Sequence, residues 1–136
     1  MKDAVNWIIG FLEEIEISRD KMRWCQNYSV YSSDCTQRTL TRDINKLLDI
    51  AYEKIMVPDY SDTIKRNGFM ERDIATADEI WIKNQTYSCI LACITWHFRR
   101  DRFHEGSLIR EGIASGALLR LFRQLRFLLD ECPAVK

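Results

Sequence analysis

The polar residues best suited to chemistry lie together in one short stretch, Arg99-Arg100-Asp101-Arg102-Phe103-His104-Glu105-Gly106. As an active site, it offers Glu105 as an acid or base, His104 as a proton shuttle, and Arg99 and Arg102 as anion-binding groups. It has no glycine-rich phosphate loop, no carboxylate pair of known spacing and no evident nucleophile. The same residues also suit a helix junction, because Asp101 can cap a following helix and Glu105 fits that helix's positive first turn. An enzyme or small-ligand site and a purely structural junction both remain open here.

A second candidate surface lies further along the chain, where Arg120, Arg123 and Phe127 follow one another at i, i+3 and i+7. On a helix this spacing places two arginines and an aromatic ring on one stripe, and these residue types are enriched at interface hot spots. Residues 96–126 hold seven arginines against three acidic residues, a net charge of +4, although the whole chain sums to zero. We therefore expect a non-enzymatic interaction or regulatory protein that binds an acidic partner, with self-association as a variant. A small inhibitor of a nucleic-acid-handling complex, as mobile elements encode, belongs to the same class.

Two other uses of these arginines follow from their chemistry. They can cover apolar surface and pair with the acidic first part of the chain, since residues 1–95 hold 12 basic and 15 acidic residues. Arg120 and Arg123 can also bind phosphates without reading sequence. Sequence-specific DNA binding is not expected, because Gly116 suits a helix-turn-helix corner but the apolar residues 117–119 after it cannot read base edges.

The cysteines indicate packing rather than metal binding. The spacing Cys89-x-x-x-Cys93-x-x-x-His97 can present three metal ligands along one side of a helix. Free cysteine is also a common core residue, and the neighbours here are apolar. We expect no metal and no cofactor. The five cysteines include no pair separated by two residues, which indicates a reducing compartment, so we expect a cytoplasmic protein.

Helical periodicity dominates the elements that carry these residues, and 46% of the chain is hydrophobic. The start of the chain is not typical of a signal peptide or a membrane span, because acidic residues at 13, 14 and 16 interrupt its apolar run. Apolar spacing and caps predict helices over residues 3–17, from a capping box at 34–37 to residue 55, and over 59–67, 77–99, 102–114 and 117–130. Residues 22–26 allow one further short helix before an aperiodic loop.

The helix predicted at 77–99 is expected to be central. The pattern Thr76-x-x-Glu79 resembles a capping box at its start, and its second half is apolar nearly all round, which is typical of a buried helix. The sequence thus predicts an all-α fold, a single domain over residues 1–136 in which about five to seven helices pack around this helix.

A family resemblance adds to this prediction. The pattern Arg99-x-Asp101-Arg102-Phe103-x-Glu105-Gly106, followed ten residues later by the stretch from Gly116 to Leu121, resembles the C-terminal signature of a family of small uncharacterised bacterial proteins, a domain of unknown function. The segment 58–60 is also similar to the family's middle. The resemblance implies an all-helical fold, a bacterial origin and a shared core role for Arg102, Phe103, Glu105 and Gly106. It carries no assigned activity.

Overall fold

The computed structural model describes residues 1–17, 38–101 and 107–131 of the chain, and the side chains of residues 1–16, 44–99 and 111–131. All regular structure in these ranges is helical, which confirms the predicted all-α fold. The elements are α1 (Lys2–Ile17), α3 (Arg38–Ile50), the π-helical turn η2 (Ala51–Ile55), α4 (Tyr60–Arg66), α5 (Glu71–Thr76), α6 (Glu79–Lys83), α7 (Tyr87–Asp101), α8 (Ser107–Ala114) and α9 (Ala117–Glu131). The loop and the capping box predicted between residues 18 and 37 lie outside this part.

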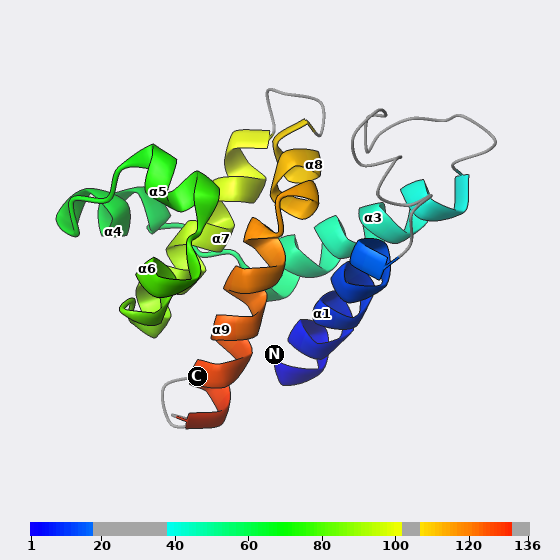
Figure 1. Ribbon diagram of the computed structural model, residues 1–136, viewed down its shortest axis with the longest axis horizontal. Coiled ribbons are helices and arrows are strands. Elements are labelled where there is room, and N and C mark those ends of the chain that lie inside the picture. Colours follow the sequence, from blue (N-terminus) through cyan, green and yellow to red (C-terminus); the bar gives the residue numbers. More distant parts are fainter. Residues whose placement is uncertain (18–37, 102–106, 132–136) are drawn as a thin grey trace.

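Helix α7 is the central element, as predicted for the second half of the 77–99 segment. Residues 89–98 are all buried, and α4, α5, α8, α9 and η2 all contact this helix. Figure 1 shows α9 crossing in front of α7, with α4, α5 and α6 on one side and α1 and α3 on the other. A helix that is apolar on every side needs neighbours all round it, and this arrangement supplies them.

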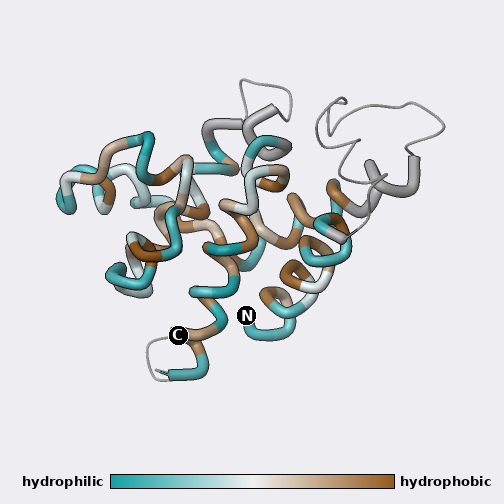
Figure 2. Tube along the Cα trace, in the orientation of Figure 1, coloured by the Kyte–Doolittle hydropathy of each residue, from teal (hydrophilic) through white to brown (hydrophobic). Residues whose placement is uncertain are grey.

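The outer helices are amphipathic. Val5, Ile8, Leu12 and Ile15 form the buried stripe of α1 and are at most 3% exposed. Figure 2 shows the resulting alternation of apolar and polar segments along α1 and α9. The ring of Trp7 stacks on Phe11 with 5.5 Å between ring centroids, and the two rings widen the apolar face of α1.

The apolar face of α3 continues into η2, and η2 ends at Ile55, three residues before Pro58. Met56 adopts an extended conformation, and its backbone N–H donates to Ala51 O at 2.9 Å, the i to i−5 bond of a π-helical turn. The next backbone N–H, of Val57, donates to the buried hydroxyl of Thr95 at 3.1 Å. Thr95 therefore joins the end of this segment to the central helix.

The predicted helix over 77–99 is wrong in its first half, where the structure has two helices and two breaks. Thr76 ends α5 rather than opening a helix, and Ala77 follows in a left-handed conformation with φ 44°. The N-cap of α6 is Asp78, whose carboxylate accepts the backbone N–H groups of Ile80 and Trp81. A helix start two residues later than expected thus replaces the predicted capping box.

The second break follows from three consecutive polar residues. The side-chain amides of Asn84 and Gln85 donate to backbone carbonyls four residues back, at 3.1 and 3.0 Å, and so end α6. The hydroxyl of Thr86 then accepts the backbone N–H of Cys89 at 3.3 Å and caps α7. Side chains that bond the local backbone compete with helix continuation. This is the physical reason why one predicted helix is observed as two.

The last two helices agree with the prediction where they are described. Asp101 is the last residue of α7, and α8 is the described part of the helix predicted over 102–114. Gly116 forms the corner before α9 with φ 83°, a conformation in which a side chain is strained. Apolar spacing predicts one buried face on this helix, made of Leu118, Leu121, Phe122, Leu125, Leu128 and Leu129. All of these are buried except Leu128, which is partly exposed, and Ala117 and Leu119 are buried as well.

Candidate functional site

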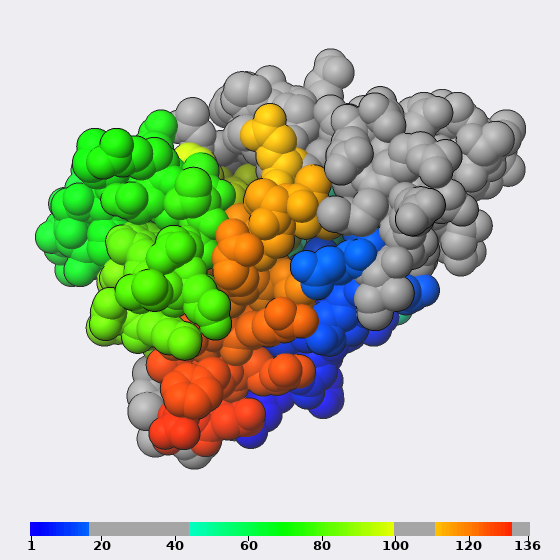
Figure 3. Space-filling view, in the orientation of Figure 1, coloured from blue at the N-terminus to red at the C-terminus, as the bar shows by residue number. Residues whose placement is uncertain are grey.

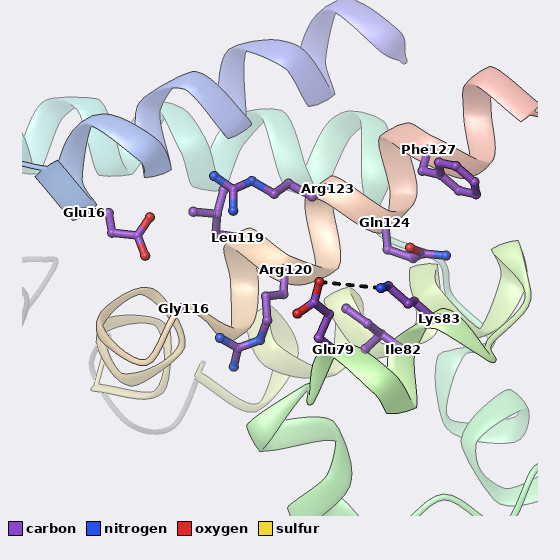
Figure 4. Close-up of a pocket in the computed structure, with 10 residues that line it drawn as sticks. All are labelled: Glu16, Glu79, Ile82, Lys83, Gly116, Leu119, Arg120, Arg123, Gln124 and Phe127. Atoms are coloured by element: carbon purple, nitrogen blue, oxygen red, sulfur yellow. Dashed lines mark ion pairs between the residues drawn. The ribbon is translucent and has the colours of Figure 1, made fainter.

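The candidate site is a groove of about 570 Å³ between α6 and α9, with the end of α1 at its rim. Figure 4 shows the side chains that line it, namely Glu16, Glu79, Ile82, Lys83, Gly116, Leu119, Arg120, Arg123, Gln124 and Phe127. The predicted stripe of Arg120, Arg123 and Phe127 is therefore brought together with residues from two other helices. Figure 3 shows that α9 runs down an open face of the molecule between α6 and α1.

Arg120 is held inside the fold more firmly than its sequence position indicates. It is partly buried, although the pattern predicts that it points outward. Its Nε donates to Ala77 O at 2.8 Å, its Nη2 to Thr76 O at 2.7 Å and its Nη1 to Ser115 O at 3.2 Å. These carbonyls lie at the C-terminal ends of α5 and α8, where the helix dipole favours a cation. The guanidinium thus joins α5, α8 and α9.

Arg123 lies one turn further along α9 and is turned toward α1. Its Nη2 donates to a carboxylate oxygen of Glu13 at 2.9 Å, and both side chains are nearly half exposed. An ion pair as exposed as this one contributes little stability, and it exchanges readily for another carboxylate. The Arg123 side chain is therefore available to an acidic ligand.

Phe127 is the main apolar group on the open side of α9, and 55% of it is exposed. It lies one turn beyond Arg123 and close to Gln124, at the end of the groove in Figure 4. A half-exposed phenylalanine gains free energy when a partner covers it, because burial removes its apolar surface from water.

The opposite wall of the groove comes from α6. Glu79 and Lys83 form an ion pair at 3.7 Å across one turn, and both side chains are largely exposed. Ile82 is buried beneath them at 2% exposure and supplies part of the apolar floor with Leu119. The lining as a whole carries three cations and two carboxylates.

The charged groups of the groove diverge instead of meeting at one point. In Figure 4, Arg120 points away from Arg123, and Phe127 lies at the far end. Acid and base catalysis needs groups within hydrogen-bond reach of one reacting atom. The charged groups of this groove therefore do not converge on one reacting atom.

The Cys89, Cys93 and His97 cluster is part of the core. Both thiols are free and buried. Burial, together with the neighbouring Cys89, raises the pKa of the Cys93 thiol to about 12, which disfavours the thiolate that a metal needs. Burial also lowers the pKa of His97 to about 4, against the opposing effect of its Nε2–H donating to Ile74 O at 3.0 Å. Within the described residues, no group of three or more potential ligands is placed to hold a metal ion.

The junction at residues 99–106 is described only at its start. Arg99 is exposed on α7, and Asp101 ends that helix. Arg102, Phe103, His104, Glu105 and Gly106 lie outside the described residues, so the enzyme or small-ligand site predicted there stays a prediction.

Sequence reasoning missed the α6 and α1 walls of the groove. Glu79 has the spacing of a helix cap, and Lys83 and Glu16 have the pattern of solvated charges. Of the lining residues that the sequence analysis did not name, Gln124 could have been found from its spacing. It lies four positions after Arg120 and therefore on the same side of the helix.

These features define a class of small all-α protein whose open groove is lined by arginines and an exposed aromatic ring. The chain belongs to the family of unknown function DUF6508, whose model matches residues 1–131. Comparison with curated proteins and with solved structures finds no match. A search of the described residues finds no helix with both the length and the apolar character that a membrane span requires.

Proposed function

We propose that this chain is a small, non-enzymatic interaction or regulatory protein of the bacterial cytoplasm, and that α9 and its groove bind an acidic segment of a partner protein. The observation that carries this proposal is Phe127, a large aromatic side chain that is 55% exposed at the end of the groove, one turn beyond Arg123. Free thiols at Cys89 and Cys93 agree with a reducing compartment.

The chemistry of the face favours carboxylates as the main ligands. Arg123 and Arg126 are exposed on α9, and a guanidinium binds a carboxylate through two parallel hydrogen bonds. An apolar side chain of the partner next to its carboxylates would cover Phe127. Aromatic and arginine side chains at the centre of an interface contribute most of the binding free energy.

The carboxylates at and near the groove favour a protein over a nucleic acid as its binding partner. Glu13, Glu16 and Glu79 lie at or near the groove, and they repel a continuous phosphate backbone. A protein segment can place isolated carboxylates opposite the arginines and leave uncharged groups opposite these glutamates.

The test is direct binding to an identified partner. The immobilised chain is exposed to a bacterial lysate, captured proteins are identified by mass spectrometry, and each purified candidate is titrated by calorimetry against wild type, Arg123→Ala and Phe127→Ala. Truncation of a central anchor costs about 2 kcal/mol or more, so we expect each variant to bind at least about 30-fold more weakly. Affinity should also fall as salt concentration rises.

A matched control distinguishes specific binding at the α9 groove from non-specific hydrophobic binding. Tyr52 is an aromatic residue of similar exposure, 47%, on η2 outside the groove, so Tyr52→Ala should bind like wild type. All variants should keep the thermal midpoint of wild type to within about 3 °C. Equal affinity of Arg123→Ala, Phe127→Ala and Tyr52→Ala for every purified candidate contradicts the proposal, as does a partner without an acidic segment.

A further inference from the structure

The outward stripe of α9 has the spacing of a helix-pairing seam. Arg120, Gln124, Phe127 and Glu131 follow one another at intervals of four, three and four residues, and none of the four is buried. At 100° per residue these positions fall within an arc of about 60° on the helix surface. The interval pattern is that of the a and d positions at which two helices pack together.

The charge of the residues on and beside this stripe changes sign on either side of Phe127. Arg120 and Arg123 precede the ring, and Asp130 and Glu131 follow it, all on the same helix. Arg123 and Glu131 are each four residues from Phe127, or about 6 Å along the helix axis. A two-fold axis through Phe127 therefore places the arginine of one copy opposite the glutamate of another, twice over.

We propose that the α9 face binds a second copy of this chain, with the two α9 helices antiparallel and Phe127 on the two-fold axis. This inference rests on the proposed function, and it names the acidic last turn of α9 in the second copy as the acidic segment. The self-complementary layout is what an isologous interface requires, since each patch must fit itself.

The surroundings of the stripe allow this contact. Figure 3 shows α9 open along its length on this face. Of the flanking charges, Asp130 is paired with Lys2 and Lys83 with Glu79 within one copy. The exposed Arg123 can exchange its Glu13 partner for the Glu131 of the second copy. On the two-fold axis, the exposed Phe127 ring of each copy packs against the same ring of the other copy.

The expected association is weak and depends on salt. Phe127 is the one large apolar side chain of the stripe, and the remaining contacts are exposed ion pairs. We expect a dissociation constant on the order of 10⁻⁵ to 10⁻⁴ M at low salt, in the range of small transient interfaces.

The experiment is sedimentation equilibrium on the full chain from about 5 to 500 µM. Wild type should form a dimer as concentration rises, and Tyr52→Ala should behave identically. Phe127→Ala should be a monomer throughout. Two charge reversals give the sharpest readout, because Arg123→Glu leaves carboxylates at both positions of the pair and Glu131→Arg leaves guanidinium groups at both.

Each reversal alone should abolish the dimer through like-charge repulsion, and an equimolar mixture of the two variants should restore it as a heterodimer. A merely destabilised variant cannot be rescued by mixing. A wild-type monomer at 500 µM, a dimer of either reversal variant alone, or a mixture that stays monomeric overturns the inference.

The outcomes also separate this inference from the proposed function. If wild type is monomeric but a purified acidic partner loses affinity for Phe127→Ala, self-association is wrong and the proposed function stands. If Phe127→Ala abolishes the dimer and leaves the affinity for every other captured partner unchanged, the docking of a different acidic protein is wrong and self-association stands.

Discussion

Replacing Arg120 with methionine should destabilise the fold far more than its position on an arginine-rich helix suggests. The side chain donates three hydrogen bonds to the C-terminal carbonyls of α5 and α8, at 2.7, 2.8 and 3.2 Å. The bond to Ala77 O is partly buried and is worth about 1.5 kcal/mol, and each exposed bond is worth about 0.5 kcal/mol. We expect Arg120→Met to lower the free energy of unfolding by about 2.5 kcal/mol.

The assay is thermal unfolding followed by circular dichroism, supported by urea titration. In a domain of this size, a loss of about 2.5 kcal/mol lowers the thermal midpoint by roughly 8 °C. Arg126→Met is the matched control, because Arg126 is exposed on the same helix, and its midpoint should change by less than about 2 °C. Arg120→Lys should recover less than half of the loss, since one ammonium group cannot span three carbonyls. Equal midpoints for Arg120→Met and Arg126→Met would refute the role assigned to Arg120.

Three further predictions test other parts of the fold. Because burial lowers the pKa of His97 to about 4 and an unfolded histidine titrates near 6.5, the unfolded state takes up the proton first as the pH falls. The free energy of unfolding should therefore drop by about 2 to 3 kcal/mol more between pH 7 and pH 4.5 in wild type than in His97→Gln, and equal pH slopes in urea titrations would contradict this. Thr95→Val leaves the Val57 N–H without its acceptor and should cost about 1 to 3 kcal/mol in urea titrations, whereas Thr95→Ser should stay within about 1 kcal/mol of wild type. Gly116→Ala should lower the thermal midpoint, because Gly116 has a φ of +83° and the new Cβ would lie 2.9 Å from Nη1 of Arg120. Gly10→Ala should raise the midpoint, because Gly10 lies within α1 and its new Cβ meets no atom within 4 Å. A shift of the same sign in both variants would contradict this reasoning.

The sequence predicts best where many apolar residues repeat within one element. Helices α1 and α9 begin and end close to the expected residues, because each carries a long apolar stripe and Gly116 marks the corner before α9. The helix expected over 77–99 is mispredicted for a local reason. Asn84 and Gln85 bond the backbone behind them, and spacing alone does not distinguish such side chains from solvated ones.

The groove is less predictable because it depends on packing. The stripe of Arg120, Arg123 and Phe127 is readable from one helix, but two of the three carbonyls that bind Arg120 lie 43 and 44 positions earlier in the chain. The ion pair of Arg123 spans 110 positions, to Glu13. Periodicity describes the faces of a helix, and it carries no information about which distant element covers each face.

Helix α5 shows what such distant contacts do for the dynamics of the chain. Its six residues are far fewer than an isolated helix needs to persist in water. Yet its carbonyls are held by His97 of α7 at Ile74 and by Arg120 of α9 at Thr76. The buried Ile74 amide, which donates to Met70 O, can exchange with solvent freely only when both contacts open, so it should exchange on the timescale of the two long core helices.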